Sequence, residues 1–436
     1  IIGNLVSKVY EPTSSCEGRI VIAADLFPSD ILKLSSENVA GLIMASGGVT
    51  SHIAILARSL QVPMVIADDA SLLSLRDGTQ VLIDAEVGDI YLTPSAEVLR
   101  SYTERQQHRA AIKQEPPTIA SQTRTADGTQ VRLLANINLL SDVSLARDLK
   151  AEGVGLYRTE FPFLIRSDWP SEDEQVAIYR QLCERLPDCE ITFRTLDLGG
   201  DKVLSFWPDS AFEANPCMGM RSIRFSLHHP DLFRQQLRAI LRASVNCPAL
   251  RIMFPMISST DEFMEARAAV HESLEQLRVE GIAHCQKPSI GMMVELPALV
   301  EVMPEMAKLG DFFCVGTNDF TQFMLAVDRT NEKVAGLYLP HHPAILRALA
   351  RIVRAVHAEG KDISICGEMA HEPRYIPFLL GIGIRTLSVD PRFLPKVQKQ
   401  IGRVTIPEVG QHAQALLDQG SVKAVSALLE AVPGMG

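Results

Sequence analysis

The sequence predicts an α/β protein with two domains, a small α/β domain followed by an eight-stranded parallel (β/α)8 barrel. From Ala126 onward, eight short apolar runs alternate with amphipathic stretches over roughly 270 residues, the size and rhythm of such a barrel. A doubly wound sheet also alternates strands with helices, but no GxGxxG follows any of these runs, so the barrel is favoured. The runs are Val131–Ile137, Gly153–Tyr157, Ile191–Leu196, Leu250–Met256, Ile290–Val294, Phe312–Val315, Ile363–Ile365 and Thr386–Val389.

The part before Ala126 divides into a small domain and a linker. Arg19–Ala24 and Gly41–Ala45 are apolar enough for buried strands, and Val81–Asp84 and Ile90–Leu92 flank Gly88-Asp89, a hairpin signal. A polar, helix-forming segment then leads to Pro116-Pro117, which ends a helix. We therefore expect a first domain over residues 1–95, a helical linker over 96–125, the barrel over 126–405 and a helical tail over 406–436.

Composition excludes several classes of protein. The 436 residues exceed one ordinary core, and 47% are hydrophobic and 22% charged, as in a soluble globular protein. A formal net charge of −10 argues against nucleic-acid binding. No apolar run is long enough to span a membrane and no leader is visible, so we expect no membrane insertion and a cytoplasmic location. The chain begins at Ile1 without Met, which indicates a piece of a longer protein.

The eight cysteines are scattered without a CxxC pair, which disfavours a zinc site. Their even number is compatible with disulfides. In a large chain without a secretion signal, however, reduced thiols are the expectation.

A glycine turn leads into His52 through Gly47-Gly48-Val49-Thr50-Ser51. Glycines let the backbone approach a charged group closely, and a helix start with Thr50 or Ser51 near its cap offers N–H groups to an anion. A histidine at this place could carry a phosphoryl group. A histidine that merely belongs to a helix cap is the alternative reading.

Polar residues gather where the predicted strands end. In a (β/α)8 barrel the carboxyl ends of the strands form the active-site rim, so these side chains should converge. Their mixture of guanidinium, carboxylate, amide and thiol groups suits a doubly charged, metal-bound substrate. They are Asn138, Arg158, Asp197, Glu295, Asn318, Asp319, Cys366 and Glu368, with Arg194 inside the third run.

Four arginines are candidates for an anion clamp, because guanidinium groups grip phosphate and carboxylate oxygens bidentately: Arg158, Arg194, Arg221 and Arg329. The alternative is that each pairs with a carboxylate on a surface helix. Arg194 lies inside a strand-like run, where an unpaired charge is costly. A pairing of Arg194 with Asp197 or a neighbouring carboxylate is therefore also open.

Glu295 and Asp319 directly follow apolar strands and could hold a hard divalent cation, since Mg²⁺ takes one or two carboxylates and completes its shell with substrate and water. Capping of the next helix is the alternative for Asp319. Cys366 at a strand end is either a packed thiol or an acid that delivers a proton to carbon.

Six motifs together resemble the phosphoenolpyruvate-utilising enzymes, and most closely the Enzyme I family of the bacterial phosphotransferase system. They appear in the family's order and cover roughly residues 20–400. The resemblance implies a swivelling phosphohistidine domain followed by a TIM barrel. The motifs are Gly47–Arg58 with Leu60–Val65, Glu152–Phe161, Phe193–Lys202, Asn215–Arg224, Val315–Gln322 with Asp328-Arg329, and Cys366-Gly367-Glu368.

The resemblance also implies a role for each matched residue. His52 would accept the phosphoryl group of phosphoenolpyruvate, with Thr50 as its hydrogen-bond partner, and Cys366 would protonate the product to pyruvate. Glu295 and Asp319 would hold Mg²⁺. An HPr-like phosphocarrier would accept the phosphoryl group, and the barrel domain would form a homodimer. The substrate-binding residues would be Arg158, Arg194, Arg221, Asn318, Asp319 and Arg329.

The sequence departs from that family at its start. We find neither the helical domain that docks HPr nor the first strand of the swivelling domain, so we expect a truncated chain or part of a fusion. The nitrogen-branch paralogue and the multiphosphoryl fusions share these motifs. Two other functions stay open: a fragment of pyruvate phosphate dikinase or phosphoenolpyruvate synthase, and a non-enzymatic module that senses phosphoenolpyruvate.

Overall fold

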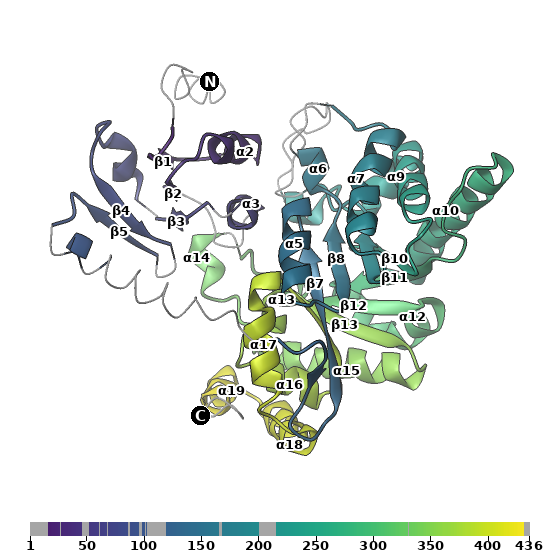
Figure 1. Ribbon diagram of the computed structural model, residues 1–436. Helices are drawn as coiled ribbons and strands as arrows, with labels where there is room; N and C mark the ends of the chain where they lie inside the picture. The colour runs from purple at the N-terminus through teal and green to yellow at the C-terminus, as the bar shows by residue number, and fades with distance from the viewer. Residues whose placement is uncertain are drawn as a thin grey trace. The chain divides into compact units, whose positions relative to one another are not determined.

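The chain folds into two compact units, Ile1–Pro116 with Arg329–Lys333, and Pro117–Asp328 with Val334–Gly436 (Figure 1). Most of the expected linker, residues 96–125, lies outside the residues that the structure describes. Across the described part, no helix combines the length and apolar character needed to cross a bilayer. The computed structural model describes residues 16–26, 28–45, 52–60, 62–67, 69–85, 88–95, 98–100, 102, 119–164, 168–199, 215–329 and 331–430.

The first unit contains a three-stranded parallel sheet in the order β1-β2-β3 and an antiparallel hairpin. All four predicted strands are confirmed, and the hairpin turns where Gly88-Asp89 predicted it. The additional strand β3 is too short for an apolar run to mark it. The elements are β1 (Ile20–Ala23), α2 (Pro28–Ser36), β2 (Gly41–Met44), α3 (His52–Ser59), β3 (Met64–Ile66), η1 (Ala70–Ser74), β4 (Val81–Asp84) and β5 (Asp89–Leu92).

The second unit is a closed barrel of eight parallel strands in the described residues, each paired with the next along the chain and the last with the first. All eight predicted runs are strands, and their ends agree with the predicted bounds to within two residues. A short strand, β6 (Thr123–Arg124), pairs antiparallel with β7. The barrel strands are β7 (Gln130–Ile137), β8 (Gly153–Arg158), β9 (Glu190–Arg194), β10 (Ala249–Phe254), β11 (Ser289–Val294), β12 (Phe312–Gly316), β13 (Asp362–Cys366) and β14 (Thr386–Val389).

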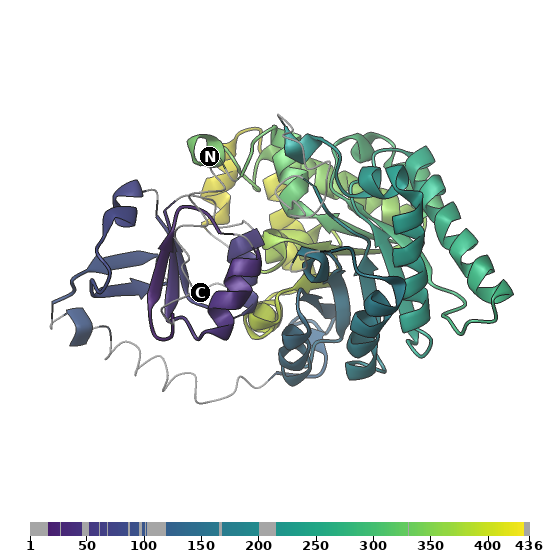
Figure 2. The ribbon, with the colours of Figure 1, turned by 90° about the horizontal axis from the view of Figure 1, so that it is seen from above.

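Helices lie outside the barrel strands, and many of them share one buried apolar core with the strands (Figures 1 and 2). They are α5 (Leu140–Asp148), α6 (Phe161–Leu164), α7 (Glu172–Arg185), α8 (Ile223–His228), α9 (Pro230–Ala243), α10 (Thr260–Val279), α11 (Ala298–Glu301), α12 (Met303–Leu309), α13 (Thr317–Leu325), α14 (Glu332–Ala335), α15 (Pro343–Ala358), α16 (Ile376–Gly381), α17 (Leu394–Ile401), α18 (Ile406–Leu417) and α19 (Val422–Leu429). Among the described residues there are also four short 3-10 turns, η1, η2 (Pro216–Met218), η3 (Glu368–Ala370) and η4 (Pro391–Phe393).

Local sequence explains where the outer helices begin. Ser171 caps α7 by accepting the backbone N–H of Glu174, whose carboxylate accepts the N–H of Ser171 at 2.8 Å. This reciprocal capping box satisfies two N–H groups that the helix itself leaves unpaired. Helix α9 begins instead with Pro230, whose missing N–H is not needed at that position.

An ionic group lies at the amino-terminal face of the barrel, the face formed by the first residues of the strands. The guanidinium of Arg251 lies 3.0 Å from Glu190 and 2.7 Å from Asp362, and 4.7 Å above the ring of Phe312. These contacts join four strands, β9, β10, β12 and β13. In barrels of this type the opposite, carboxyl-terminal face carries the chemistry.

Candidate active site

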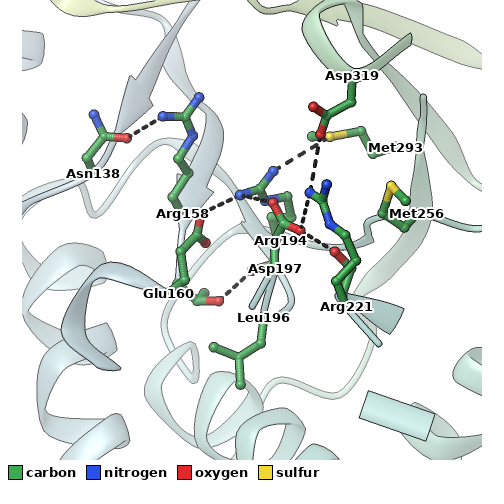
Figure 3. Close-up of polar contacts among 12 residues, drawn as sticks. Asn138, Arg158, Glu160, Arg194, Leu196, Asp197, Arg221, Met256, Met293 and Asp319 are labelled. Carbon is green, nitrogen blue, oxygen red and sulfur yellow. Dashed lines mark hydrogen bonds and ion pairs between the residues drawn. The ribbon is translucent and has the colours of Figure 1, made fainter. Parts of the chain in front are cut away.

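Charged side chains alternate in sign along a line at the carboxyl-terminal face of the barrel (Figure 3). Arg194 lies 2.5 Å from Glu160 and 3.0 Å from Asp197. Arg221 lies 3.0 Å from Asp197 and 3.4 Å from Asp319. We call these five residues the ion-pair chain. It joins segments that are far apart in sequence.

The ion-pair chain is buried, and each charge in it depends on its neighbours. Side-chain exposure is 6% for Arg194 and 0% for Glu160. Burial disfavours the charge on Arg194, but the charges of Glu160 and Asp197 outweigh it, so the pKa of this guanidinium is raised. Arg221 behaves in the same way beside Asp197 and Asp319. The expectation that Arg194 might pair with Asp197 is confirmed, and the alternative of surface ion pairs is wrong for both arginines.

Arg158 has a different environment from the other two arginines. It ends β8, is half-buried, and donates to the side-chain oxygen of Asn138 at 3.2 Å. Burial lowers its pKa first, and the charge of Arg194 lowers it further. Among the described residues, no carboxylate pairs with Arg158. A cation in this position, next to a second cation, suits an anion that comes from outside the protein.

Glu295 lies directly after β11 and is nearly fully buried. One of its oxygens accepts the backbone N–H of Met256 at 2.7 Å. Met256 has a positive φ of 56°, which is uncommon for a residue with a side chain. In this conformation its backbone N–H reaches the carboxylate of Glu295. Burial, then the charges of Asp319 and Asp197, raise the pKa of Glu295 to about 8.

Glu295 and Asp319 fit a divalent cation. Their mutual repulsion, which raises the pKa of Glu295, is what a bound cation would relieve. In the described part, no group of three or more His, Cys, Asp or Glu side chains is arranged to hold a metal. Mg²⁺ takes only one or two protein carboxylates when substrate and water complete its shell, and these two residues match that number.

Residues Asn318 and Asp319 lie in the first turn of α13, whose N-cap is Gly316. The alternative that Asp319 caps this helix is therefore wrong. The side-chain oxygen of Asn318 accepts the backbone N–H of Glu368 at 2.9 Å. This bond orients the amide and leaves its NH₂ group as the donor for a ligand.

Cys366 ends β13 and is buried inside the barrel. Its thiol donates to the carbonyl oxygen of Val315 at 3.5 Å. A hydrogen bond with Cys314, followed by burial, raises its pKa well above the ordinary value of a thiol. The group therefore stays protonated at neutral pH, as an acid must, while it also packs in an apolar cluster with Leu156, Met253, Met293, Phe312 and Cys314.

Some supporting residues carry no signal in the sequence. Gln236 on α9 is fully buried, accepts the N–H of Leu196 at 3.0 Å and donates to Thr159 at 3.0 Å. Thr159 in turn donates to the carbonyl oxygen of Arg194 at 2.8 Å. Ser222 donates to Asp197. These bonds hold the ends of β8 and β9, and with them the ion-pair chain.

The structure does not unite every predicted site residue. His52 is the first residue of α3 in the first unit. Thr50 lies outside the described residues. Arg329 belongs to the segment grouped with the first unit. The second unit thus brings together Arg158, Arg194, Arg221, Glu295, Asn318, Asp319 and Cys366 by its strand ends and the loops that follow them.

Comparison with known proteins bears on this site directly. Residues 113–406 match the model of the "PEP-utilising enzyme, PEP-binding domain", and residues 16–88 match the "PEP-utilising enzyme, mobile domain". The phosphoenolpyruvate-protein phosphotransferase of Geobacillus stearothermophilus is 40% identical over 418 residues, which are 96% of this chain and 72% of that protein. The chain belongs to this family. The expected resemblance and fold class are both confirmed.

Another phosphoenolpyruvate-protein phosphotransferase, from Bacillus subtilis, is 39% identical over 432 residues, 99% of this chain and 75% of that protein. Among solved structures, a citrate lyase from Burkholderia xenovorans aligns with a TM-score of 0.33 and 20% identity, covering 59% of this chain and 81% of that one. The family assignment rests on the two family models and on the phosphotransferases, and this structural likeness adds nothing to it.

Proposed function

We propose that this chain takes the phosphoryl group of phosphoenolpyruvate onto its own His52, releases pyruvate, and passes the group to an HPr-like phosphocarrier protein, as the first step of a phosphorelay. The observation that carries the site assignment is Arg158, a cation at the carboxyl-terminal face with an amide as its partner and a second arginine beside it. The activity of the phosphotransferases to which the chain is similar supports the reaction.

Phosphoenolpyruvate would be held by Arg158, Arg194 and Arg221, with Arg329 and Asn318 as further donors. Carboxylates already orient Arg194 and Arg221, so these side chains lose little conformational freedom when substrate binds. Arg158 supplies a positive charge that forms no ion pair with a described carboxylate and lies beside the charge of Arg194. Phosphoryl transfer depends mainly on such positioning and charge neutralisation.

Glu295 and Asp319 would hold Mg²⁺ in this site. When bound, the ion supplies positive charge for the phosphoryl oxygens and acts as a Lewis acid toward the enolate oxygen. The backbone N–H of Met256 keeps one oxygen of Glu295 occupied, which orients the carboxylate.

The reaction then has two steps at the residues of this chain. The bond between phosphorus and the enol oxygen breaks while a bond to His52 forms, and Thr50 would hydrogen-bond the phosphorylated imidazole. The remaining enolate takes a proton at carbon from the thiol of Cys366, which gives pyruvate. We further propose that the barrel forms a homodimer, as the family resemblance implies.

Incubation with phosphoenolpyruvate and Mg²⁺ tests this function. We expect one acid-labile, base-stable phosphoryl group per chain and one pyruvate released for each. His52→Ala should abolish the label, whereas His271→Ala, on the exposed surface of α10, should keep it. Labelling of His52 from ATP would favour a dikinase or synthase fragment, and binding without pyruvate release would favour a sensing module.

A further inference from the structure

Four cysteines far apart in sequence come together at the amino-terminal face of the barrel, opposite the candidate active site. Cys183 lies near the end of α7, and Cys189 immediately precedes β9. Cys247 lies two residues before β10, and Cys285 is tied by its N–H to Leu241 of α9 at 2.9 Å. All four are thiols in the structure.

Cys183 and Cys247 contact each other directly. A hydrogen bond between the two thiols is the first cause of the shift in the pKa of each, upward for Cys183 and downward for Cys247. The Cys183 sulfur also lies 3.6 Å from the hydroxyl of Ser244, and the N–H of Cys247 donates to the carbonyl oxygen of Ser244 at 3.1 Å. The side chain of one cysteine and the backbone of the other are thus held by the same serine.

The sulfur of Cys247 is surrounded by hydrogen-bond donors. Besides the Cys183 thiol, the backbone N–H groups of Ala249 and Ile191 at the starts of β10 and β9 point at it. The hydrogen bond with Cys183 is the largest cause that lowers the pKa of Cys247. Burial raises this pKa, and the two backbone N–H groups lower it again, so that it is about 7. When protonated, Cys247 donates instead to the carbonyl oxygen of Cys189 at 3.9 Å.

We propose that Cys247 and Cys183 form a peroxide-sensitive thiol pair that closes to a disulfide. The Cys247 thiolate attacks a peroxide oxygen, so that a sulfur–oxygen bond forms, the oxygen–oxygen bond breaks and, with one proton, water leaves. The Cys183 thiol then attacks the resulting sulfenic acid, and a second water leaves as the disulfide forms. Two thiols are oxidised and one hydrogen peroxide is reduced to two waters.

The two cysteines have different roles because their surroundings differ. Cys247 is half-buried and accepts hydrogen bonds, so it is the attacking thiolate, whereas Cys183 is 8% exposed and is the donor that resolves the sulfenic acid. The pKa values of Cys189 and Cys285 are raised, chiefly by burial. In the residues that the structure describes, no metal-binding group of three or more side chains includes these thiols, so redox chemistry is favoured over metal binding.

The rate of this oxidation follows from the thiolate fraction. At pH 7, the thiolate fraction of a thiol with a pKa of about 7 is about fiftyfold larger than that of a thiol with the ordinary pKa of 9.0. A thiolate of lower pKa is also a weaker nucleophile, which leaves a net advantage of about sixfold in the rate of oxidation. The rate should rise with pH through about 7 and then level off. Glu190, Cys183, Cys189 and Cys285 are the other titratable groups that bear on this sulfur.

Brief exposure of the intact chain to hydrogen peroxide, alkylation of the remaining thiols and non-reducing peptide mapping test the proposal. We expect one disulfide, between Cys183 and Cys247, while Cys366 stays reduced because its thiol is protonated. In Cys183→Ser, the sulfenic acid of Cys247 should persist and react with dimedone. In Cys247→Ser, Cys183 should stay reduced, and the matched variant Cys285→Ser should still form the disulfide.

Mapping of the unaltered chain decides the question even if a variant fails to fold. A disulfide that joins other cysteines, or equal oxidation at all thiols, would overturn the proposal. If Cys183 is oxidised in Cys247→Ser as fast as in the parent chain, Cys247 is not the reactive thiol and the proposal is overturned as well.

Discussion

Burial, rather than distance, should decide how much an ion pair contributes to the stability of this barrel. Two pairs share the same separation of 2.5 Å, Glu160 with Arg194 and Glu275 with Arg278. The first has side-chain exposures of 0% and 6%, the second 59% and 65%. Replacing each glutamate by glutamine removes a charge while nearly preserving shape, so the two substitutions form a matched comparison.

The loss of stability expected for Glu160→Gln depends on the contacts that Arg194 keeps after the substitution. A buried hydrogen bond to a charged group contributes about 1.5–3 kcal/mol, and complete loss of a partner from a buried pair costs about 3–5 kcal/mol. Arg194 retains Asp197 at 3.0 Å, so we expect the smaller range for Glu160→Gln. Arg194→Met, which removes the buried arginine partner of Glu160 and leaves Asp197 with Arg221, should reach the larger one. Glu275→Gln should change the free energy of unfolding little, because solvent screens that pair.

Urea denaturation followed by tryptophan fluorescence measures these changes. Trp169 belongs to the second unit and packs against the ring of Phe163, so its fluorescence reports the barrel. The midpoint should fall in Glu160→Gln while the slope of the free energy against urea stays constant. If Glu160→Gln and Glu275→Gln lose equal stability, or if Glu160→Gln loses none, the argument from burial is refuted.

Three further predictions concern the site itself. Gly367 has φ of 89°, and a Cβ there would meet the hydroxyl of Thr317 and lie 2.7 Å from the side-chain oxygen of Asn318. Gly367→Ala should therefore raise KM for phosphoenolpyruvate and destabilise the chain more than the control Gly360→Ala. At Gly360 φ is 63° and nothing lies within 4 Å of an added Cβ, so only the backbone cost of about 1–2 kcal/mol remains. Equal effects of the two substitutions would contradict this reasoning. Asp319→Ala should remove most phosphorylation of His52 and its dependence on magnesium concentration, since a site with two protein carboxylates cannot spare one; near-normal turnover at the same magnesium concentration would show that Asp319 is no ligand. Cys366→Ala should still permit phosphoryl transfer but slow the release of pyruvate. It should also abolish the chirality of the pyruvate that is made from labelled phosphoenolpyruvate in heavy water. Equally racemic pyruvate from the parent chain and from Cys366→Ala would rule out Cys366 as the proton donor. Because the pKa of Cys366 is raised, protonation by the parent chain should persist past pH 9.0 and be lost only at still higher pH.

Most of the architecture was predictable from local patterns. The eight barrel strands were visible because a strand buried on both faces is a short, continuous apolar run between amphipathic helices. Strand β3 was missed because three residues are too few to form a pattern. The positive φ of Met256 was also invisible, since a loop after a strand can take this conformation without any glycine to mark it.

The sequence also indicated which side chains lie at the carboxyl-terminal face, because in parallel strands the residue after each apolar run is carried to the same rim. It did not indicate which of them pair. Arg221 and Asp319 are 98 positions apart and meet only because the sheet closes on itself. Glu160 stood in a recognised motif without a role until the structure placed it against Arg194.

The thiol pair marks the limit of sequence alone most clearly. Cys183 lies in α7 and Cys247 in the loop before β10, with no CxxC spacing between them, and the composition of the chain suggested only reduced thiols. What the sequence by itself determined is periodicity, a consequence of local backbone geometry, and thereby the strands, the helices and the rim. What only the tertiary structure decided is which distant groups share a low-dielectric contact, because burial and charge pairing depend on how the barrel closes.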